Sequence, residues 1–145
     1  MKRLLLLNGP NINLLGKREE NIYGSFTLAD IEMELKKIAN ENGFELDTFQ
    51  SNHEGDLVDK IQQANSKYNG IIFNPAAYTH TSIALRDAIL AIDVPVIEVH
   101  ISNIHSREAF RHQSMLAPAC AGQIVGLGKM GYRLACIALM EQAKQ

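Results

Sequence analysis

The stretch LLLLNGPNINLLGKREENIYGS, residues 4–25, joins an apolar run to a long irregular segment. Four consecutive leucines are typical of a strand that is buried on both faces of a sheet. From residue 9 to about residue 26 the sequence shows neither helical nor strand periodicity. A connection longer than ~12 to 15 residues is uncommon in a compact domain and tends to be functional or disordered. The stretch therefore predicts a central strand followed by a functional loop.

Four more short apolar runs follow the first one, which spans residues 3–8; they are 44–50, 70–74, 94–99 and 122–127. Between and after them, apolar residues recur with the 3.6-residue period of a helix, in 28–38, 57–64, 83–92 and 132–139. Thr27 is expected to cap the first helix, and Asn42 with Gly43 to end it. Strand and helix alternate five times, which indicates an α/β fold with a parallel sheet.

We expect residues 1–145 to form one doubly wound domain with the flavodoxin-like strand order 2-1-3-4-5 and helices on both faces. The length and the 46% hydrophobic content are those of an ordinary globular domain with one core. The net charge of −2, with 14 dispersed lysines and arginines, argues against a nucleic-acid partner.

The chain is expected to be cytoplasmic and without a membrane segment. Its first apolar stretch stops at Asn8, short of the apolar region of a signal peptide, and no run reaches membrane length. Cys120 and Cys136 lie sixteen residues apart without a CxxC pattern. They are therefore read as buried free thiols in a reducing compartment, with neither a disulfide nor zinc.

Polar side chains stand at the carboxyl ends of three predicted strands: Asn8, Asn74, and Glu98 with His100. Doubly wound sheets bind ligands outside these ends, at the switch point between strands one and three. Because a buried carboxylate needs a partner and residues two apart share one side of a strand, we expect Glu98 to pair with His100. The pair would hold the imidazole in one tautomer, as acid/base catalysis requires, although a purely structural ion pair is the alternative.

The motif that follows Asn74 predicts a helix start. Thr79 or Thr81 is expected to cap this helix and to leave His80 in its first turn, where the dipole disfavours the protonated ring. The alternative is an exposed histidine in a capping segment. A metal site at His100 and His105 is not expected, because no acidic or cysteine residue completes a ligand set.

Arg107 and Arg111 are spaced i and i+4, on one face of a predicted short helix. Two guanidiniums side by side repel unless an anion lies near them, either a bound carboxylate or Glu108. In the first loop, Gly16 and Gly24 bracket the sequence KREENIY, which suits a lid at about 16–24 that carries Arg18 and Tyr23. The alternative is a solvated loop with a packed tyrosine.

The sequence GLGKMG, residues 126–131, fits the pattern GxGxxG, but too few residues follow it for a dinucleotide site. Its glycines are expected to allow close packing of a strand against a helix.

Five blocks together resemble the type II 3-dehydroquinate dehydratases from end to end: NGPNINLLG, REENIYG, FNPAAYTHTS, EVHISNIHSREAFRHQS and IVGLGKMGY. The resemblance implies a hydro-lyase of the shikimate pathway that converts 3-dehydroquinate to 3-dehydroshikimate by anti elimination through an enolate. It also implies a flavodoxin-like protomer, no cofactor or metal, and a homododecamer built as a tetramer of trimers.

The resemblance also implies roles for named residues. Tyr23 matches the base, Arg18 its support, His100 the acid, Glu98 the residue that orients it, and Asn11 the residue that holds a water against the enolate. The positions that match substrate-binding residues are Asn74, His80, Ile101 through its backbone, Ser102 and Arg111, with Arg107 near the site and Asp87 reaching in from a neighbouring subunit.

Two positions depart from the family's usual pattern. Glu20 stands where a proline is common in the lid, and Ala76 stands where a glycine is common. The first departure would loosen the lid. The second matters if the backbone there needs a positive φ, which alanine tolerates poorly.

Proton abstraction by Tyr23 at neutral pH requires an ionised phenol. The pKa of a free tyrosine, about 10, must therefore fall by ~3 units, which requires about 4 kcal/mol of stabilisation of the phenolate. One guanidinium at ~4 Å supplies about that much at an effective dielectric constant near 20. Three alternatives are less well supported. An imine-forming enzyme needs a lysine at an apolar strand end, and the sequence has none there. An FMN-binding electron carrier needs a hydroxyl-rich first loop to hold the phosphate, which this sequence lacks. A non-catalytic regulatory or scaffold domain does not account for the many matching acid/base residues.

Overall fold

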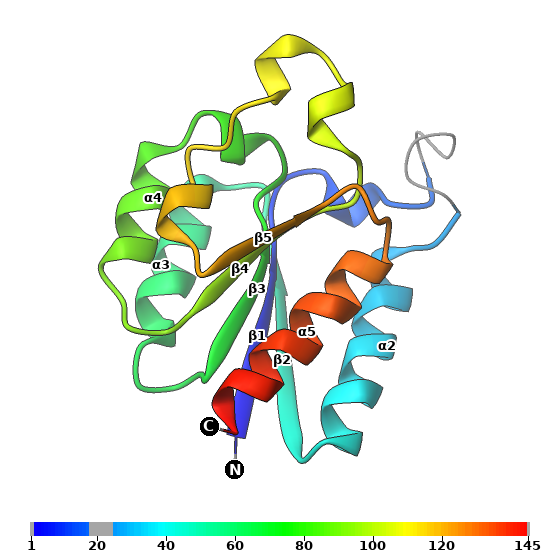
Figure 1. Ribbon diagram of the computed structural model, residues 1–145, viewed down its shortest axis with the longest axis vertical. Helices are drawn as coiled ribbons and strands as arrows, with labels where there is room; N and C mark the ends of the chain where they lie inside the picture. The colour runs from blue at the N-terminus through cyan, green and yellow to red at the C-terminus, as the bar shows by residue number, and fades with distance from the viewer. Residues whose placement is uncertain (1, 18–24, 145) are drawn as a thin grey trace.

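The computed structural model describes residues 2–17 and 25–144 and shows one five-stranded parallel sheet (Figure 1). The strands are β1 Lys2–Asn8, β2 Phe44–Gln50, β3 Gly70–Asn74, β4 Val96–His100 and β5 Gly122–Val125. Their order is β2-β1-β3-β4-β5, and every neighbouring pair is parallel. The predicted strand order and the flavodoxin-like α/β fold are therefore confirmed.

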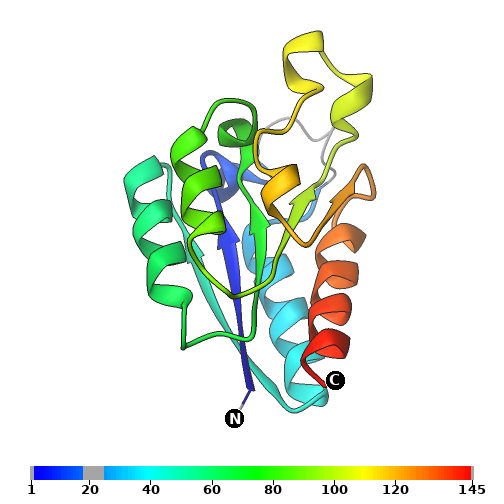
Figure 2. The ribbon, with the colours of Figure 1, turned by 60° about the vertical axis from the view of Figure 1, so that its left-hand side comes forward.

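Helices cover both faces of this sheet (Figures 1 and 2). One face carries α2 Leu28–Glu41 and α5 Met130–Ala143, and the other carries α3 Glu54–Ala64 and α4 Ile83–Leu90. Strand β1 explains the two layers, because its leucines alternate between them. Leu4 and Leu6 pack into the α2 and α5 core, Leu5 and Leu7 into the α3 and α4 core, and all four are fully buried.

Helix α2 begins at the predicted cap. The Thr27 hydroxyl accepts a hydrogen bond from the Asp30 backbone N–H at 3.2 Å, and the Asp30 carboxylate accepts one from the Thr27 N–H at 2.9 Å. This reciprocal capping box satisfies two of the N–H groups that a helix start leaves unpaired. The helix ends where predicted, before Asn42 and Gly43, and Gly43 has a φ of +79°.

The connection from β4 to β5 contradicts the prediction that strand and helix alternate five times. The described residues contain no α-helix there. They contain three short 3₁₀ turns, η3 Ile104–Ser106, η4 Ala109–Arg111 and η5 Ala117–Ala119. Figure 2 shows η3 and η4 beyond the carboxyl end of the sheet, whereas η5 lies beside α4 shortly before β5 begins. Side chains bond the backbone in this excursion, since Asn103 accepts from the His105 N–H and Ser114 from two N–H groups of residues 116–117. Such bonds compete with a continuous helix.

Several predicted boundaries were wrong by a few residues. The fourth strand begins at Val96 instead of residue 94 and includes His100, and the fifth ends at Val125 because Gly126 turns to a φ of +83°. Ser82, not Thr79 or Thr81, caps α4 by accepting from the Leu85 N–H at 2.9 Å. His80 therefore ends the short helix η2 Ala76–His80 instead of opening α4.

Two predicted core stripes were also partly wrong. Ile83 and Ala84 of α4 and Leu134 of α5 lie exposed, whereas the buried positions of α4 are Leu85, Ala88 and Ile89. On α5, the expected packing of glycine against a strand is observed at Gly131. A Cβ there would lie 3.3 Å from Val99 Cγ1 and 3.4 Å from Ile124 Cγ2.

The predicted lid falls largely outside the described residues, which exclude Arg18, Glu20, Tyr23 and Gly24. The chain leading to it contains the 3₁₀ turn η1 Ile12–Leu14.

Both cysteines are free thiols, Cys136 buried and Cys120 half-buried. Burial raises the pKa of Cys136 to about 11 and that of Cys120 to about 12, so both stay protonated near neutral pH. None of the described helices is long and apolar enough to cross a membrane.

The two ends of the described chain meet at the amino end of the sheet. The Lys2 ammonium donates to the Ala143 carbonyl at 2.6 Å. Figure 1 shows both termini at this end, opposite the excursion between β4 and β5.

Ala76 occupies a left-handed conformation, with a φ of +53°. We predict that Ala76→Gly raises the free energy of unfolding by about 0.5–1 kcal/mol, because glycine adopts this φ without strain. The control is Ala138→Gly, at a half-buried alanine inside α5 that packs against the same core. This change is expected to lower the free energy by about 1 kcal/mol. Urea unfolding of the three proteins measures both values. A loss of stability in Ala76→Gly would contradict the prediction.

Candidate functional site

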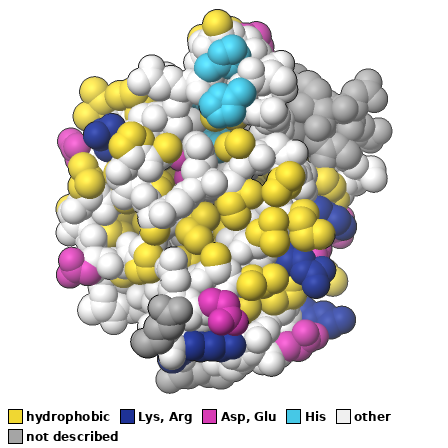
Figure 3. All heavy atoms as spheres, in the orientation of Figure 1, with side chains coloured by type: hydrophobic (Ala, Val, Ile, Leu, Met, Phe, Trp, Pro, Cys, Tyr) yellow, Lys and Arg dark blue, Asp and Glu magenta, His cyan; other side chains and the backbone are white. Residues whose placement is uncertain are grey.

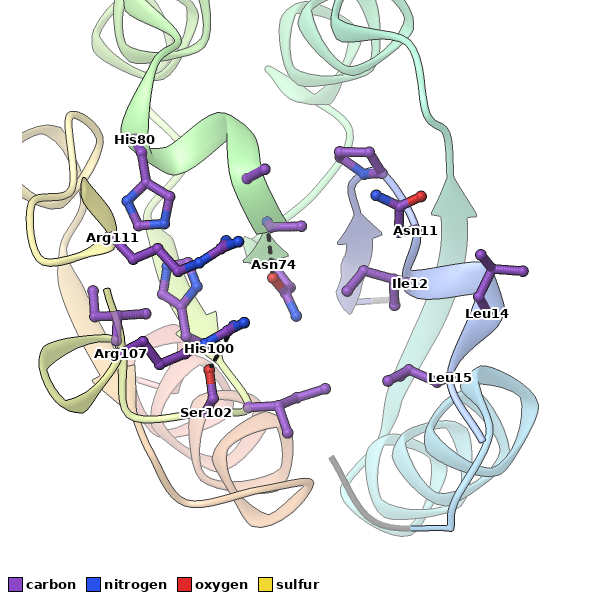
Figure 4. Close-up of a pocket in the computed structure, with 15 residues that line it drawn as sticks. Asn11, Ile12, Leu14, Leu15, Asn74, His80, His100, Ser102, Arg107 and Arg111 are labelled. Carbon is purple, nitrogen blue, oxygen red and sulfur yellow. Dashed lines mark hydrogen bonds between the residues drawn. The ribbon is translucent and has the colours of Figure 1, made fainter. Parts of the chain in front are cut away.

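A cavity of about 350 Å³ opens at the carboxyl ends of β1, β3 and β4 (Figure 4). Eight of the site residues proposed from the sequence line it: Asn11, Asn74, His80, His100, Ile101, Ser102, Arg107 and Arg111. Figure 4 shows Asn11, Ile12 and Leu15 on one side of the cavity, the histidines and arginines on the other, and Asn74 between them. The predicted convergence of strand-end residues is therefore observed.

The sheet register explains this meeting point. Asn8 at the end of β1 lies opposite Asn74 at the end of β3, and Phe73 of β3 lies opposite Glu98 of β4. The chain turns away from β1 and β3 in opposite directions across the sheet, which opens a crevice above their ends. Apolar side chains of η1 and η2, with Ile104, complete the wall. The cavity thus joins polar strand ends to an apolar lining, as small-molecule sites do.

Glu98 lies at the base of the site with no exposed surface. Its carboxylate accepts from His100 Nε2 at 2.5 Å, from the Ser114 hydroxyl at 2.9 Å, from Gln123 Nε2 at 3.2 Å and from the Thr79 hydroxyl. Burial acts to raise the pKa of Glu98, but the hydrogen bond and charge of His100, and then the two hydroxyl donors, outweigh it and lower the pKa below 4.5. The group is therefore a buried carboxylate that stays ionised.

The predicted pairing of Glu98 with His100 is confirmed, and it fixes the roles of the imidazole nitrogens. An ionised carboxylate can only accept a hydrogen bond, so Nε2 of His100 must carry a hydrogen. The nitrogen left for proton exchange with a bound molecule is then Nδ1. A carboxylate that orients a histidine in this way also stabilises the positive imidazolium.

His80 lies beside His100, with ring centroids 6.4 Å apart and an angle of 25° between the planes. Its Nδ1 donates to the Gln113 carbonyl at 2.8 Å, so Nε2 is the acceptor nitrogen of the neutral ring. Burial, followed by the positive charges of His100 and Arg111, lowers the pKa of His80 despite the Gln113 bond, which acts to raise it. The expected neutral state was right, but its cause is burial and not a helix dipole.

Arg107 and Arg111 both line the cavity, although no single helix carries them as predicted. Arg107 follows η3, and Arg111 ends η4. Glu108 Oε1 lies 3.1 Å from Arg111 Nε and 3.7 Å from Arg107 Nε, so the intramolecular partner considered for them is present. Arg107 Nη1 also donates to the Ser102 hydroxyl at 3.4 Å. Two guanidiniums against one exposed carboxylate leave this wall positive and suited to an anionic ligand.

Asn11 is held on the opposite wall by its backbone. It has a φ of +69°, and its N–H donates to the Asn52 side-chain oxygen at 3.0 Å. Asparagine tolerates this left-handed conformation better than most residues, which accounts for its presence where η1 begins.

Four proposed residues are not among the described residues that line the cavity. Glu98 lies at the base of the site without lining the cavity. Asp87 lies exposed on α4 and does not line the cavity. Arg18 and Tyr23 fall outside the described residues.

Sequence reasoning missed the three side chains that join His100 in binding Glu98: Thr79, Ser114 and Gln123. Gln123 had a detectable signal, since it is a polar residue in a predicted strand and pairs directly with Glu98. Thr79 was read as a helix cap. Ser114 closes the block that contains both arginines, but its approach to Glu98 depends on the path of the whole excursion.

The arrangement can bind a small anionic molecule and move a proton. It offers a carboxylate-oriented imidazole, a neutral imidazole, two guanidiniums and amide groups in one cavity. Within residues 2–17 and 25–144, no three histidine, cysteine or acidic side chains gather in a way that could hold a metal ion.

Comparisons with known proteins agree with this picture. The family described as Dehydroquinase class II matches residues 2–140. The chain is 62% identical to a 3-dehydroquinate dehydratase from Anoxybacillus flavithermus, and the match covers 99% of this chain and 97% of that protein. It is 59% identical to a 3-dehydroquinate dehydratase from Bacillus mycoides, and that match covers 100% of this chain and 99% of that protein. The crystal structure of type II dehydroquinase from Butyrivibrio crossotus has a TM-score of 0.93 and 46% identity, covering 95% of this chain and 97% of that one.

Lowering the pH tests whether the buried Glu98 carboxylate stabilises the fold through its ionised form. Because the pKa of Glu98 is lowered in the fold from 4.5, its stabilising contribution is present above about pH 4.5 and is lost as the pH falls through the folded value. We predict that Glu98→Gln lowers the free energy of unfolding by about 1–3 kcal/mol at pH 7, because amide hydrogens then face donors.

The difference between wild type and Glu98→Gln should narrow as the pH falls below 4.5. Melting temperatures recorded from pH 7 to pH 3 measure it. The control is Asp59→Asn, on the exposed face of α3. The difference in melting temperature between this variant and the wild type should stay constant from pH 7 to pH 3. A constant gap for Glu98→Gln over the whole range would contradict the lowered pKa.

Proposed function

Because the chain belongs to the class II dehydroquinase family, we propose that it is a hydro-lyase that converts 3-dehydroquinate to 3-dehydroshikimate. The observation that carries the proposal is the His100 imidazole, fixed by a buried, ionised Glu98 in a cavity with two arginines. The direct experiment is to add 3-dehydroquinate and follow the ultraviolet absorbance of the conjugated enone. Absence of turnover would reject the proposal.

The substrate is a β-hydroxy ketone, and its dehydration needs a base, a group that stabilises the enolate and an acid. His100 is the acid, which gives a proton from Nδ1 to the departing hydroxyl while Glu98 stabilises the imidazolium form. Asn11 holds a water against the enolate oxygen from the opposite wall. No step draws on a cofactor or a metal ion.

Substrate groups are assigned by charge and by donor type. The carboxylate binds Arg111, the Ser102 hydroxyl and the backbone N–H of Ile101, on the positive wall. The ring hydroxyls meet the Asn74 amide and the neutral His80, whose Nε2 accepts. Arg107 supports this wall through its bond to Ser102.

Tyr23 is proposed as the base and Arg18 as the cation that makes it acidic, both within the lid at about 16–24 of a single catalytic domain, residues 1–145. Supporting this, the described residues on the two sides of the segment lie together. A Cβ on Gly16 would be 3.0 Å from the Phe26 carbonyl oxygen, and the preceding Leu15 lines the cavity. A nearby guanidinium stabilises the phenolate form of a tyrosine.

The active assembly is proposed to be a homododecamer, a tetramer of trimers, in which Asp87 enters the site of a neighbouring protomer. Asp87 is exposed on α4 between Ile83 and Leu90, which are 60% and 61% exposed. Residues spaced in this way share one helix face, and such an apolar face around a carboxylate suits a contact between copies. More apolar side chains lie exposed over α5, as Figure 3 shows, including Leu134 and Ile137.

The enzyme is placed in the shikimate pathway, which makes aromatic amino acids by way of chorismate, and in the cytoplasm. Its substrate and two free thiols support this placement. Neither the family match nor the relatives support the alternative of an FMN-binding electron carrier.

We predict that His100→Ala lowers kcat by ~10²–10⁴-fold with a modest change in KM, because general acid catalysis acts in the transition state. Arg18→Ala should likewise lower kcat severely. The control is His105→Ala, at an exposed histidine outside the cavity, which should keep the wild-type rate. The enone absorbance assay measures all three. A near-normal kcat in His100→Ala would contradict the acid role of His100. A near-normal kcat in Arg18→Ala would contradict the proposed role of Arg18.

Mixed assemblies should show whether Asp87 acts across protomers. Asp87→Ala and His100→Ala are each expected to be nearly inactive. Co-expressed and randomly assembled, they should regain about one quarter of the wild-type activity, because that fraction of sites receives both intact residues from different chains. Mass photometry should give assemblies of about twelve chains. Mixtures no more active than the separate variants would contradict an Asp87 contribution from a neighbour.

A further inference from the structure

A buried chain of hydrogen bonds runs from the cavity into the core of the protein. Asn74 Nδ2 donates to the Tyr132 hydroxyl at 2.8 Å, and this hydroxyl donates to Asn8 Oδ1 at 2.6 Å. Asn8 and Tyr132 have no exposed surface, and Asn74 is 3% exposed. Of the three, only Asn74 lines the cavity. Tyr132 comes from the first turn of α5, far from the other two in sequence.

The direction of every bond in this chain is determined by one backbone group. The Ala76 N–H can only donate, and it lies 3.0 Å from the Asn74 side-chain oxygen. The other end of the Asn74 amide, Nδ2, must then face Tyr132 and donate to it. The phenol hydrogen is left for Asn8 Oδ1. Exchanging the oxygen and nitrogen of the Asn74 amide would place donor against donor at Ala76.

The orientation of the Asn74 amide is therefore set by the Ala76 N–H at the cavity wall and by the Tyr132 hydroxyl behind it. Its Nδ2 carries two hydrogens, of which Tyr132 takes one, and its oxygen has two lone pairs, of which the Ala76 N–H takes one. One donor and one acceptor position remain for a ligand. Without the phenol, the amide would keep only the Ala76 bond and would be free to rotate about it.

We propose that Tyr132 is a positioning residue that holds the Asn74 amide in the one orientation that binds the ring hydroxyls of the substrate. This inference rests on the proposed function, in which Asn74 meets those hydroxyls. Tyr132 does not line the cavity and acts only through Asn74.

The surroundings of the phenol fit this role. Burial raises the pKa of Tyr132 above its ordinary value of 10.0, so its hydroxyl keeps the hydrogen that Asn8 accepts. Among the described residues, Asn8 Nδ2 is the one buried side-chain nitrogen or oxygen atom without a hydrogen-bond partner. An unpaired buried amide is costly, so the useful part of Asn8 is the oxygen that anchors the phenol.

The test is a double-mutant cycle in which Tyr132→Phe and Asn74→Ala are made singly and together. Tyr132→Phe alone should raise KM about tenfold and change kcat by less than about threefold, since substrate binding is lost in ground and transition states alike. In the Asn74→Ala background, Tyr132→Phe should have no further effect on kcat/KM. A merely structural role would give the same loss in both backgrounds.

Tyr68→Phe is the matched control. The Tyr68 hydroxyl donates to Asp47 at 2.6 Å, the ring is 7% exposed, and it lies beyond the opposite end of β3. This variant loses one hydroxyl bond without any link to Asn74. Its KM should equal that of the wild type when Asn74 is present and that of Asn74→Ala when Asn74 is replaced, assayed well below the melting temperature of each protein.

Asn8→Leu serves as the second variant if Tyr132→Phe does not fold. It removes the acceptor of the phenol hydrogen and keeps the ring, so it should raise KM less, again only when Asn74 is present. Wild-type KM in Tyr132→Phe, or equal losses with and without Asn74, would overturn the proposal. Wild-type kinetics in Asn74→Ala would instead reject the substrate-binding role of Asn74.

Discussion

The buried carboxylate of Glu98 is the constraint that shapes the functional end of this fold. A negative charge without exposed surface is tolerated only when donors surround it. Its four partners come from different parts of the chain: His100 from the same strand, Thr79 from the turn after β3, Ser114 from the excursion after β4, and Gln123 from β5. Solvating one carboxylate therefore draws these segments together around the carboxyl end of the sheet.

The same contacts organise the chemistry. Ser114 accepts from the backbone at 116–117 while it donates to Glu98, so it ties the end of the excursion to the charge. Gln113, its neighbour in sequence, supplies the carbonyl that fixes the tautomer of His80. Upstream in the excursion, Arg107 and Arg111 form the positive wall. The pairing of one buried charge thus places both the His100 imidazole and the two guanidiniums to which the proposed function assigns proton transfer and anion binding.

The sheet could be predicted because its signals are local. Short apolar runs marked the five strands, of which β1, β3 and β4 are buried along most of their length, and polar residues at the strand ends marked the crevice. Glu98 and His100 are two residues apart on one strand and therefore point to the same face, which was enough to predict their contact.

The remaining features depended on tertiary contacts that a linear pattern does not contain. The arginines of the excursion have helical spacing, yet side-chain caps at Asn103 and Ser114 replace the helix with single turns. Ile83 fits a core stripe but is exposed, because the buried face of α4 is rotated toward Leu85. Tyr132 was read correctly as a core residue, but periodicity says nothing of where its hydroxyl bonds.

The bond between Lys2 and the carbonyl of Ala143 closes the chain almost into a ring at the end of the sheet away from the cavity. A short peptide joining these ends would span little distance, so a circularly permuted chain opened at a surface turn should retain the same core. Affinity tags or reporter domains attached at either end would likewise project from the far side of the protomer and leave entry of a small molecule unobstructed.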